Sequence, residues 1–487
     1  MSVAGNAVPA GAAEVRPTPS TRHLALRGSA LTMVGFGASQ ALRLGGNLVL
    51  AKLLFPGAFG VVGLAGVFLS GLQMFSDIGI GPSIIQNKRG EDRAFLDTAW
   101  TIQVIRGTLL WLVTCAIAWP ISELYDKQLL YVLPVTGLVA LISGFNSTAG
   151  FGAYRRLALA RIVGLDLFCQ LVSVVVMITW AYFDRTVWAL VAGGLTAAMI
   201  RAVLSHIIFE GGRDRFRLEP QAVRELLHFG RWIFISTVVT FLSLQADRLL
   251  LGVLVPIGVV GVYTLAMSVA RLPIEVATRL SGDVLFPVLS RAAHGDRSVL
   301  ERHFARARGA ILAAMLAVSA AMAIGAPLFF RLLYDARYEE AAWIAPMLVL
   351  AFWFEILHVS ADRLLLAIGN SKALALSNGV RAVAMAGGCL LGYQVGGLPG
   401  FLAGVCLGSL AGHVVIQWTL ARAGFGIVKA DAVLTGALLV AWALSEGLGE
   451  AFRPIGRTTG DLAAAVLVVG AVTLLAGFRA KKLVAKA

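Results

Sequence analysis

The chain has 487 residues, of which 58% are hydrophobic and 14% are charged, and its mean hydropathy is +0.82. Such a composition excludes an ordinary soluble protein and indicates an all-α polytopic membrane protein. The apolar runs are continuous rather than alternating, which favours helices over strands. The formal net charge is +14, but Lys and Arg gather in alternate loops, so nucleic acid is not an expected partner.

Residues 1–27 are rich in Ala, Gly, Pro and Ser and lack the apolar core of a signal peptide, so we expect a disordered cytoplasmic tail. About fourteen membrane-spanning helices are expected to follow, each of roughly twenty residues or slightly more. Their expected positions are 29–53, 57–81, 95–119, 128–149, 159–183, 187–209, 229–253, 257–289, 305–328, 342–367, 372–394, 398–420, 430–448 and 460–478. The eighth is too long for a simple span, so its end should project into the cytoplasm.

The charge of the loops predicts the orientation. Loops 87–93, 154–156, 211–217 and 291–308 are basic, as is the tail at 479–487. The turns near Pro56 and Pro256 carry few positive charges. By the positive-inside rule, the basic loops and both termini lie in the cytoplasm.

An internal repeat relates the two halves of the chain. In the segments Leu42–Ala65 and Leu242–Ala266, Pro56 falls on Pro256 and, after a slip of one residue, Gly60 falls on Gly261. A shorter echo pairs residues 187–193 with 398–404. Six spans in each half make the repeats parallel, about an axis along the membrane normal.

These patterns predict the domain organisation. We expect an N-lobe at 28–209 and a C-lobe at 229–420, with two further helices at 430–478. Residues 210–228 would link the lobes. Within and beyond this linker, the segment from Leu218 to Trp232 has helical apolar spacing, which is typical of a helix at the membrane interface.

Arg271, Glu275 and Arg279 recur every four residues on the eighth span, so they share one helical face. An ionisable group at membrane depth is costly and normally faces a bundle interior or a wet cavity. Two roles stay open. The arginines could hold phosphate oxygens, because a guanidinium forms forked hydrogen bonds with a diphosphate. Alternatively, Glu275 could hold both arginines in structural ion pairs.

Span one carries Arg43 and Asn47, and the repeat places them opposite Asp247 and Arg248 of span seven, across a central cleft. We interpret Arg43 as a contact for a substrate diphosphate. Asp247 and Arg248 would form either a gate or a structural ion pair.

Span ten carries Glu355, His358 and Asp362, whose spacings of three and four residues put them on one face. Three titratable groups there could bind a coupling cation or relay protons. Alternatively, the neighbouring Arg363 could simply neutralise Asp362.

Single charges lie in other spans. Arg106 and Arg381 are the deepest, and they could line a cationic cavity or extend towards the membrane surface. On span twelve, glycines recur every four residues, which predicts close packing against a neighbouring helix; they are Gly400, Gly404, Gly408 and Gly412. The chain has no P-loop, no GxSxG motif and no metal-binding pattern, so we expect no enzyme, no cofactor and no metal.

Two long regions resemble the polysaccharide-type flippases of the MOP (multidrug/oligosaccharidyl-lipid/polysaccharide) superfamily. The first is FPGAFGVVGLAGVFLSGLQMFSDIGIGPSIIQ (55–86), followed by FLDTAW (95–100). The second comprises FGRWIFISTVVTFLSLQADRLLLGVL (229–254) and LPIEVATRLSGDVLFPVLSR (272–291). The resemblance comes closest to the Wzx-type branch for O-antigen and exopolysaccharide. It implies two six-helix lobes in a V around a central cavity, plus two C-terminal helices.

The resemblance also implies a function. The chain would move undecaprenyl-diphosphate-linked oligosaccharide across the bacterial inner membrane, with a cationic cavity that fits the intramembrane arginines. The candidate substrate contacts are Arg43, Asn47, Arg106, Arg271 and Arg381. Expected partners are the lipid-linked oligosaccharide and membrane lipids, together with a polysaccharide polymerase and its assembly machinery. A cation-coupled small-molecule exporter of the drug-extruding (MATE) kind and a flippase for the peptidoglycan lipid precursor stay open as alternatives.

Overall fold

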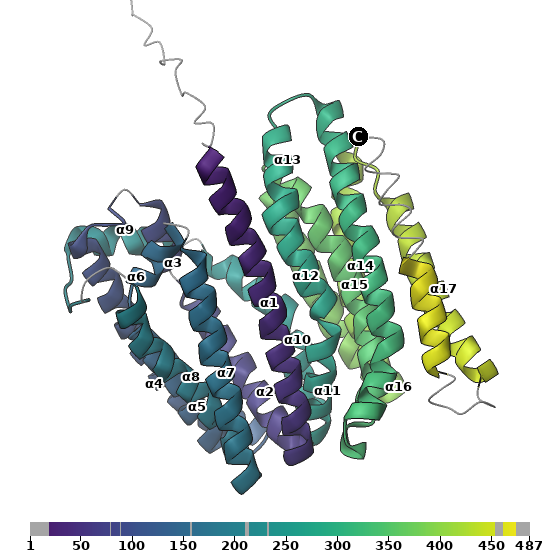
Figure 1. The fold of residues 1–487 in the computed structure, drawn as a ribbon, viewed down its shortest axis with the longest axis horizontal. Coiled ribbons are helices and arrows are strands. Elements are labelled where there is room, and N and C mark those ends of the chain that lie inside the picture. Colours follow the sequence, from purple (N-terminus) through teal and green to yellow (C-terminus); the bar gives the residue numbers. More distant parts are fainter. Residues whose placement is uncertain are drawn as a thin grey trace, which may run out of the picture.

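The computed structural model describes residues 19–77, 79–87, 89–155, 158–209, 214–230, 233–452 and 461–473, and every element within these ranges is helical (Figure 1). The first half of the chain forms α1 (Pro19–Leu53), α2 (Pro56–Phe75), α3 (Ile80–Gln86), α4 (Arg93–Leu124), α5 (Leu129–Gly144), α6 (Ala149–Arg155), α7 (Leu159–Phe183) and α8 (Trp188–Ile208). We call these helices the N-half. In it, α4 packs on α5, α7 packs on α8, and α1 lies along α7.

The second half begins after α9 (Pro220–Gly230). It comprises α10 (Ile233–Leu254), α11 (Ile257–Ala270), α12 (Leu272–Leu280), a π-helical turn at Ser281–Leu285, α13 (Phe286–Ala292), α14 (Arg297–Leu333), a 3₁₀ turn at Ala336–Tyr338, α15 (Ala341–Ala367) and α16 (Ser371–Arg422). We call α10–α16 the C-half. α17 (Val428–Phe452) packs on α14, and the helix Asp461–Thr473 joins the same apolar cluster.

Among the described residues, nine helices are long and apolar enough to cross a membrane, or ten if the bent pair α11 and α12–α13 is one span. The chain is therefore a polytopic helical membrane protein, as expected. The number fourteen stays a prediction, because α5 and Asp461–Thr473 are short and α16 combines two predicted spans. Gly396 and Gly397 interrupt α16 with non-helical backbone angles, and Gly397 has a φ of 59°.

The expected N-terminal tail is too long by several residues. α1 begins at Pro19, within the segment expected to be disordered. Proline suits the first turn of a helix, because the amide hydrogen it lacks would have no partner there. The remainder of that tail, residues 1–18, and the C-terminal tail at 479–487 lie outside the described residues.

The two repeat-related turns meet where the halves join. α2 packs directly on α11. A Cβ on Gly60 would overlap the carbonyl oxygen of Ile257, and a Cβ on Gly261 would overlap that of Pro56. These contacts are reciprocal, which is the arrangement that a two-fold pseudo-axis between equivalent helices produces. The repeat read from the sequence thus corresponds to a close backbone contact between the halves.

The glycine stripe predicted to pack a helix is confirmed. Gly400, Gly404 and Gly408 face the preceding stretch of α16, where an added Cβ would overlap Gly392, Gly388 and Met385 respectively. The two stretches therefore pack backbone to backbone.

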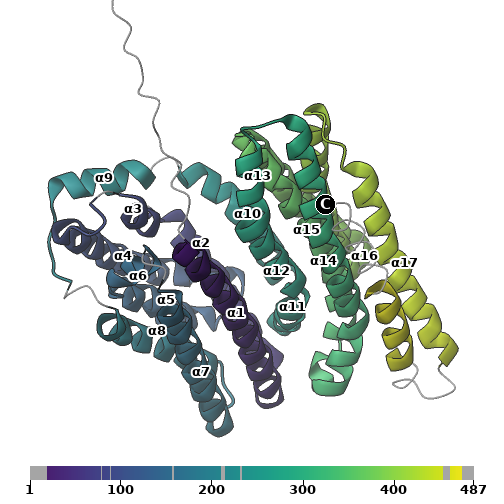
Figure 2. The same ribbon diagram turned by 45° about the horizontal axis from the view of Figure 1, so that its top comes forward.

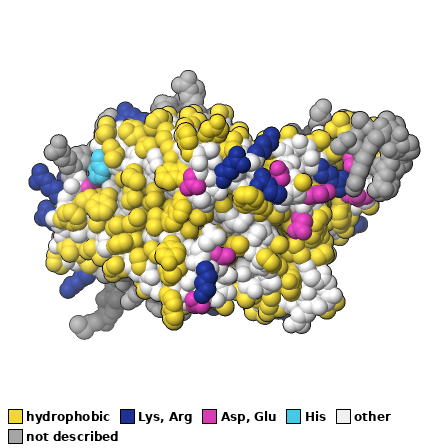
Figure 3. Space-filling view, turned by 90° about the horizontal axis from the view of Figure 1, so that it is seen from below, with side chains coloured by type: hydrophobic (Ala, Val, Ile, Leu, Met, Phe, Trp, Pro, Cys, Tyr) yellow, Lys and Arg dark blue, Asp and Glu magenta, His cyan; other side chains and the backbone are white. Residues whose placement is uncertain are grey.

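The molecule has two distinct ends. We call the end with α9, α13 and the α13–α14 turn the basic end, and the end with the turns at Pro56 and Pro256 the proline end (Figures 1 and 2). Seen from below, towards the proline end, hydrophobic side chains predominate and charged side chains are scattered (Figure 3).

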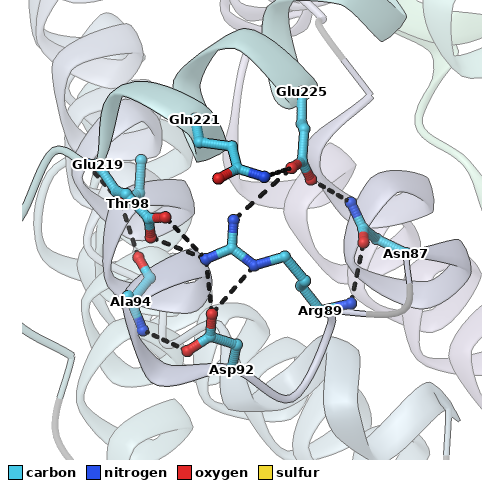
Figure 4. Close-up of polar contacts among 8 residues, drawn as sticks. All are labelled: Asn87, Arg89, Asp92, Ala94, Thr98, Glu219, Gln221 and Glu225. Carbon is cyan, nitrogen blue, oxygen red and sulfur yellow. Dashed lines mark hydrogen bonds and ion pairs between the residues drawn. The ribbon is translucent and has the colours of Figure 1, made fainter.

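The described part of the linker is fixed to the N-half at the basic end. Arg89 contacts three carboxylates, at 2.6 Å from Asp92, 2.8 Å from Glu219 and 3.6 Å from Glu225 (Figure 4). The hydrogen bonds to Glu219 and Asp92 raise the pKa of Arg89, and the hydrogen bond from Arg89 lowers the pKa of Asp92. Thr98 accepts a hydrogen bond from the Glu219 amide at 3.1 Å. α9 therefore forms where the sequence predicts it and packs on α3 and α4.

Candidate functional site

α1 of the N-half meets α12 of the C-half through polar side chains near the middle of both helices. Arg43 lies 3.5 Å from a carboxylate oxygen of Glu275 and 3.5 Å from the carbonyl oxygen of Ser268. Gln40 donates a hydrogen bond to the same carboxylate. The Nε of Arg43 is shielded from solvent and has no partner among the described residues. Arg43 therefore faces α11 and α12, and its polar contacts are not with Asp247 or Arg248.

Arg271 lies at a bend between α11 and α12. The two helices differ in direction by 42°, because Pro273 has no amide hydrogen for the carbonyl of Val269 and its ring crowds that turn. The Arg271 guanidinium lies 5.5 Å from the centre of the Phe352 ring. That of Arg279 lies 4.2 Å from the centre of the Phe36 ring, on α1. Neither arginine pairs with a carboxylate within the described part of the chain.

Across the residues it describes, the structure does not contain the ion pairs of the second alternative, in which Glu275 would hold both arginines. Glu275 pairs with Arg43 and holds neither Arg271 nor Arg279. Four-residue spacing puts the three side chains on one face, but Glu275 points to α1, where Gln40 and Arg43 each donate one hydrogen bond to its carboxylate. The two flanking arginines rest on aromatic rings instead.

Asp247 and Arg248 also do not pair with each other. The Tyr263 hydroxyl donates to Asp247 at 2.5 Å, and the Arg248 guanidinium contacts the Met267 sulfur at 2.7 and 3.0 Å. Adjacent residues of a helix point in directions that differ by about 100°, and here each finds its own partner on α11. The guanidinium groups of Arg248 and Arg271 are close enough to repel each other. Asn47, also on α1, is half-buried.

Arg381 lies elsewhere, inside the C-half. It forms an ion pair with Glu355, and both side chains are less than a tenth exposed. Ser409 adds a 3.5 Å contact to the same carboxylate. Arg381 was expected to contact substrate, but in this structure its charge is already neutralised within the helix bundle.

The other two candidates for ion coupling do not join Glu355. His358 lies 3.5 Å from the hydroxyl of Ser377, and Asp362 pairs with its neighbour Arg363 at 3.3 Å. No group of three His, Cys, Asp or Glu side chains in the described ranges could hold a metal ion. Glu355, His358 and Asp362 therefore lie on one helical face, but each contacts a different partner.

A second buried ion pair was missed in the sequence. Arg308 on α14 makes a two-pronged contact with Asp431 on α17, at 2.7 and 3.1 Å. His413 and Gln417 contact the same carboxylate at 3.0 and 3.2 Å. Arg308 had been read as the end of a basic loop and Asp431 as the start of a span. Their separation of 123 residues carries no sequence signal that could pair them.

Arg106 belongs to the N-half, apart from the α1–α12 contact. Its guanidinium donates to the Ser76 hydroxyl at 2.9 Å and to the Gln73 carbonyl at 2.8 Å, and it lies 4.0 Å from Asp77. Gln73, Asp77 and Arg106 line a cavity of about 530 Å³ between α2, α4, α5, α7 and α8. The predicted cationic set is thus divided among three places.

At the proline end, the C-half contacts the α1–α2 turn. The buried Tyr338 hydroxyl donates to the Leu54 carbonyl at 3.0 Å, and its ring packs edge-on against Phe59. Arg337 lies over the ring of Phe55, 4.9 Å from its centre. Together with the Gly60–Gly261 contact, this closes the proline end.

The boundary between the halves thus carries an excess of positive charge. Four guanidinium groups, of Arg43, Arg248, Arg271 and Arg279, lie there with two carboxylates, of Asp247 and Glu275, and among the described residues only Arg43 forms an ion pair with one of them. Guanidinium groups without carboxylate partners retain donors for an anionic ligand, and phosphate oxygens match their geometry.

Comparison with known proteins finds a family that matches much of the chain. The sequence model of the family "Polysaccharide biosynthesis protein" matches residues 49–343. The amylovoran biosynthesis protein AmsL of Erwinia amylovora is 26% identical over 275 residues, which are 55% of this chain and 70% of AmsL. The teichuronic acid biosynthesis protein TuaB of Bacillus subtilis is 22% identical and covers 79% of this chain and 75% of TuaB.

Among solved structures, the lipid II flippase MurJ in an inward closed conformation has a similar fold. It superposes with a TM-score of 0.67 and 14% identity, covering 92% of this chain and 98% of MurJ. This likeness concerns the polytopic helical fold alone.

Proposed function

Since the chain belongs to the polysaccharide biosynthesis protein family of the MOP superfamily, we propose that it flips lipid-linked polysaccharide repeat units across the bacterial inner membrane. The lipid carrier we propose is undecaprenyl diphosphate. Transport of this kind needs no covalent step, so the chain acts as a carrier rather than an enzyme.

The excess of guanidinium groups at the boundary between the halves supports this proposal. A diphosphate carries several negative charges, and Arg271 and Arg279 have no carboxylate partner among the described residues. Arg43 shares Glu275 with Gln40 and keeps an unpartnered Nε. The substrate diphosphate would lie between these three arginines, with Asn47 beside them, while the glycan occupies the wet side and the polyprenyl chain stays in lipid.

Movement would follow alternating access by rocking of the two halves. The contacts of Gly60, Gly261 and Tyr338 close the proline end, so release on that side requires them to separate. We propose that the basic end faces the cytoplasm, because the loops there are rich in arginine. The same orientation places both termini in the cytoplasm.

The energy source would be an ion gradient, the membrane potential or the substrate gradient. For ion coupling we favour His358 over Glu355 and Asp362, because Arg381 and Arg363 already pair with these two carboxylates. The lipid-linked unit and membrane lipids are the proposed partners, and a polysaccharide polymerase with its assembly machinery would use the flipped product.

The first test is Arg271→Ala in a strain that lacks the chromosomal gene. We expect at least a tenfold fall in surface polymer and an accumulation of diphosphate-linked oligosaccharide in the inner membrane, because a boundary cation is lost. Arg185→Ala is the matched control, since Arg185 lies exposed in the turn after α7. It should restore polymer fully.

Three results would count against the proposal. Normal polymer export by Arg271→Ala would remove the arginine from the mechanism. Unchanged polymer and lipid pools in the deletion strain would favour a small-molecule exporter, and drug efflux would then be measured. Accumulation of cell-wall precursor would instead favour a peptidoglycan lipid flippase.

A further inference from the structure

We propose that the cavity inside the N-half is a saccharide-binding subsite, which holds one or two sugars of the repeat unit while the arginines at the boundary hold the diphosphate. This inference rests on the proposed function and adds a second recognition point, for the glycan rather than the lipid carrier. The cavity lies at the basic end, between α2, α4, α5, α7 and α8, with the short helices α3 and α6 at its rim.

The size of the cavity suits a small ligand. Its volume of about 530 Å³ lies within the roughly 300–1,000 Å³ that small-molecule sites occupy. Gly81 contributes to its shape, because a Cβ there would lie 2.8 Å from the ring of Phe151. The Phe151 ring therefore packs against the backbone of α3 at the cavity wall.

Hydrogen-bonding groups in the wall have capacity to spare. The Oδ1 atom of Asn146 is shielded from solvent and accepts no hydrogen bond from the described residues. A buried acceptor without a donor is costly, and a ligand hydroxyl that reaches this atom after a small movement of the cavity wall would remove that cost. The Arg106 guanidinium has five N–H donors, of which the described structure engages two in hydrogen bonds. Gln73 also lines the cavity.

The charge of the cavity argues against a phosphate and for an uncharged, hydroxyl-rich ligand. Asp77 lies 4.0 Å from Arg106, and Asp166 lies 2.5 Å from Arg201. Each arginine therefore has its own carboxylate, unlike Arg271 and Arg279 at the boundary. Neutral ion pairs, amides and an aromatic ring at the rim, from Tyr154, offer donors, acceptors and an apolar face at once.

The linker connects this cavity to the rest of the chain. Ser147 lines the cavity, and its hydroxyl lies 2.7 Å from Asp214 of the linker. Thr148 contacts the same carboxylate at 2.6 Å. The cavity wall and the linker are thus held as one body at the end where we propose that the substrate is loaded.

The test separates sugar binding from lipid binding, with protein in lipid nanodiscs. One probe is the free oligosaccharide released by mild acid from the host's lipid-linked repeat unit, observed by saturation-transfer NMR. The other is undecaprenyl diphosphate without sugar, observed by thermophoresis. Asn146→Ala should weaken oligosaccharide binding about fivefold, as expected for a lost hydrogen bond, and leave undecaprenyl diphosphate unaffected. Arg271→Ala should do the reverse.

Tyr154→Phe at the exposed rim provides a second variant in case Asn146→Ala folds poorly, and it should weaken the oligosaccharide signal in the same way. Gln128→Ala, which removes an exposed amide at the opposite end of the N-half, is the matched control. Equal weakening of both probes, no weakening of either, or no binding of oligosaccharide by the wild type would overturn the subsite. If the wild type binds oligosaccharide but the deletion strain shows no change in lipid-linked pools, the flippase proposal fails while the subsite stands.

Discussion

Charged side chains are paired inside the C-half, whereas most of those at the boundary between the halves have no partner of opposite charge in the described part of the chain. Inside the C-half, Arg381 forms a buried ion pair with Glu355. Where α17 packs on this half, Arg308 and Asp431 are 4% and 2% exposed and bind each other through two hydrogen bonds. At the boundary, Arg271 and Arg279 rest on aromatic rings and have no carboxylate among the described residues. Paired buried charges join helices that move together, whereas unpaired charges stay available to a ligand.

The same difference holds for the other contacts of the two regions. α17 is joined to α14 and α16 by the Asp431 carboxylate, which three side chains contact: those of Arg308, His413 and Gln417. The halves meet through a glycine contact, the partly exposed ion pair of Arg43 and Glu275, single hydrogen bonds and ring packing. Changes inside the C-half should therefore affect folding, and changes at the boundary should affect transport.

The largest expected effect is on folding, from Arg308→Ala. It leaves Asp431 buried without its main partner, which typically costs about 3–5 kcal/mol. We expect the variant to lose most of its monodisperse fraction in detergent, measured by size-exclusion chromatography after graded heating. Arg302→Ala on the exposed side of the same helix should elute like the wild type. An Arg308→Ala protein as stable as the wild type would remove the distinction between the two regions.

A smaller but clear effect is expected from Gly261→Ala. The new Cβ would overlap the Pro56 carbonyl oxygen, so the proline end could not close and polymer export should fall about tenfold or more. Spin labels at Gln128 and Gln394, in a background without the four native cysteines, should report a longer distance across that end. Gly258→Ala has open space around the new methyl group, and an equal loss of export there would refute the closure mechanism.

Tyr338→Phe should have the smallest effect of the three. It removes one hydrogen bond to Leu54, worth about 1 kcal/mol, and should shift the closed population of the proline end by about fivefold. The same spin labels measure this shift. Tyr334→Phe is a close control, because the buried Tyr334 hydroxyl has no partner among the described residues. Equal shifts in the two variants would assign the effect to loss of any hydroxyl in this region.

Local sequence patterns predicted the helices and the contacts of small residues. The continuous apolar runs predicted membrane helices, because backbone N–H and C=O groups in lipid must form hydrogen bonds within their own segment. The repeat that matched Gly60 with Gly261 identified two positions that now contact across the pseudo-axis. The glycines of residues 400–412 predicted tight packing for the same reason, since only a residue without a side chain lets two backbones approach.

The tertiary structure alone decided which partner each charge has. A spacing of four residues determines the helical face of Arg271, Glu275 and Arg279, but the partner of Glu275 comes from α1, more than 230 residues away. Arg381 and Arg271 look alike as single arginines in apolar spans, yet one is neutralised by Glu355 and the other is not. Helical periodicity depends on local backbone geometry, whereas pairing depends on how distant helices pack.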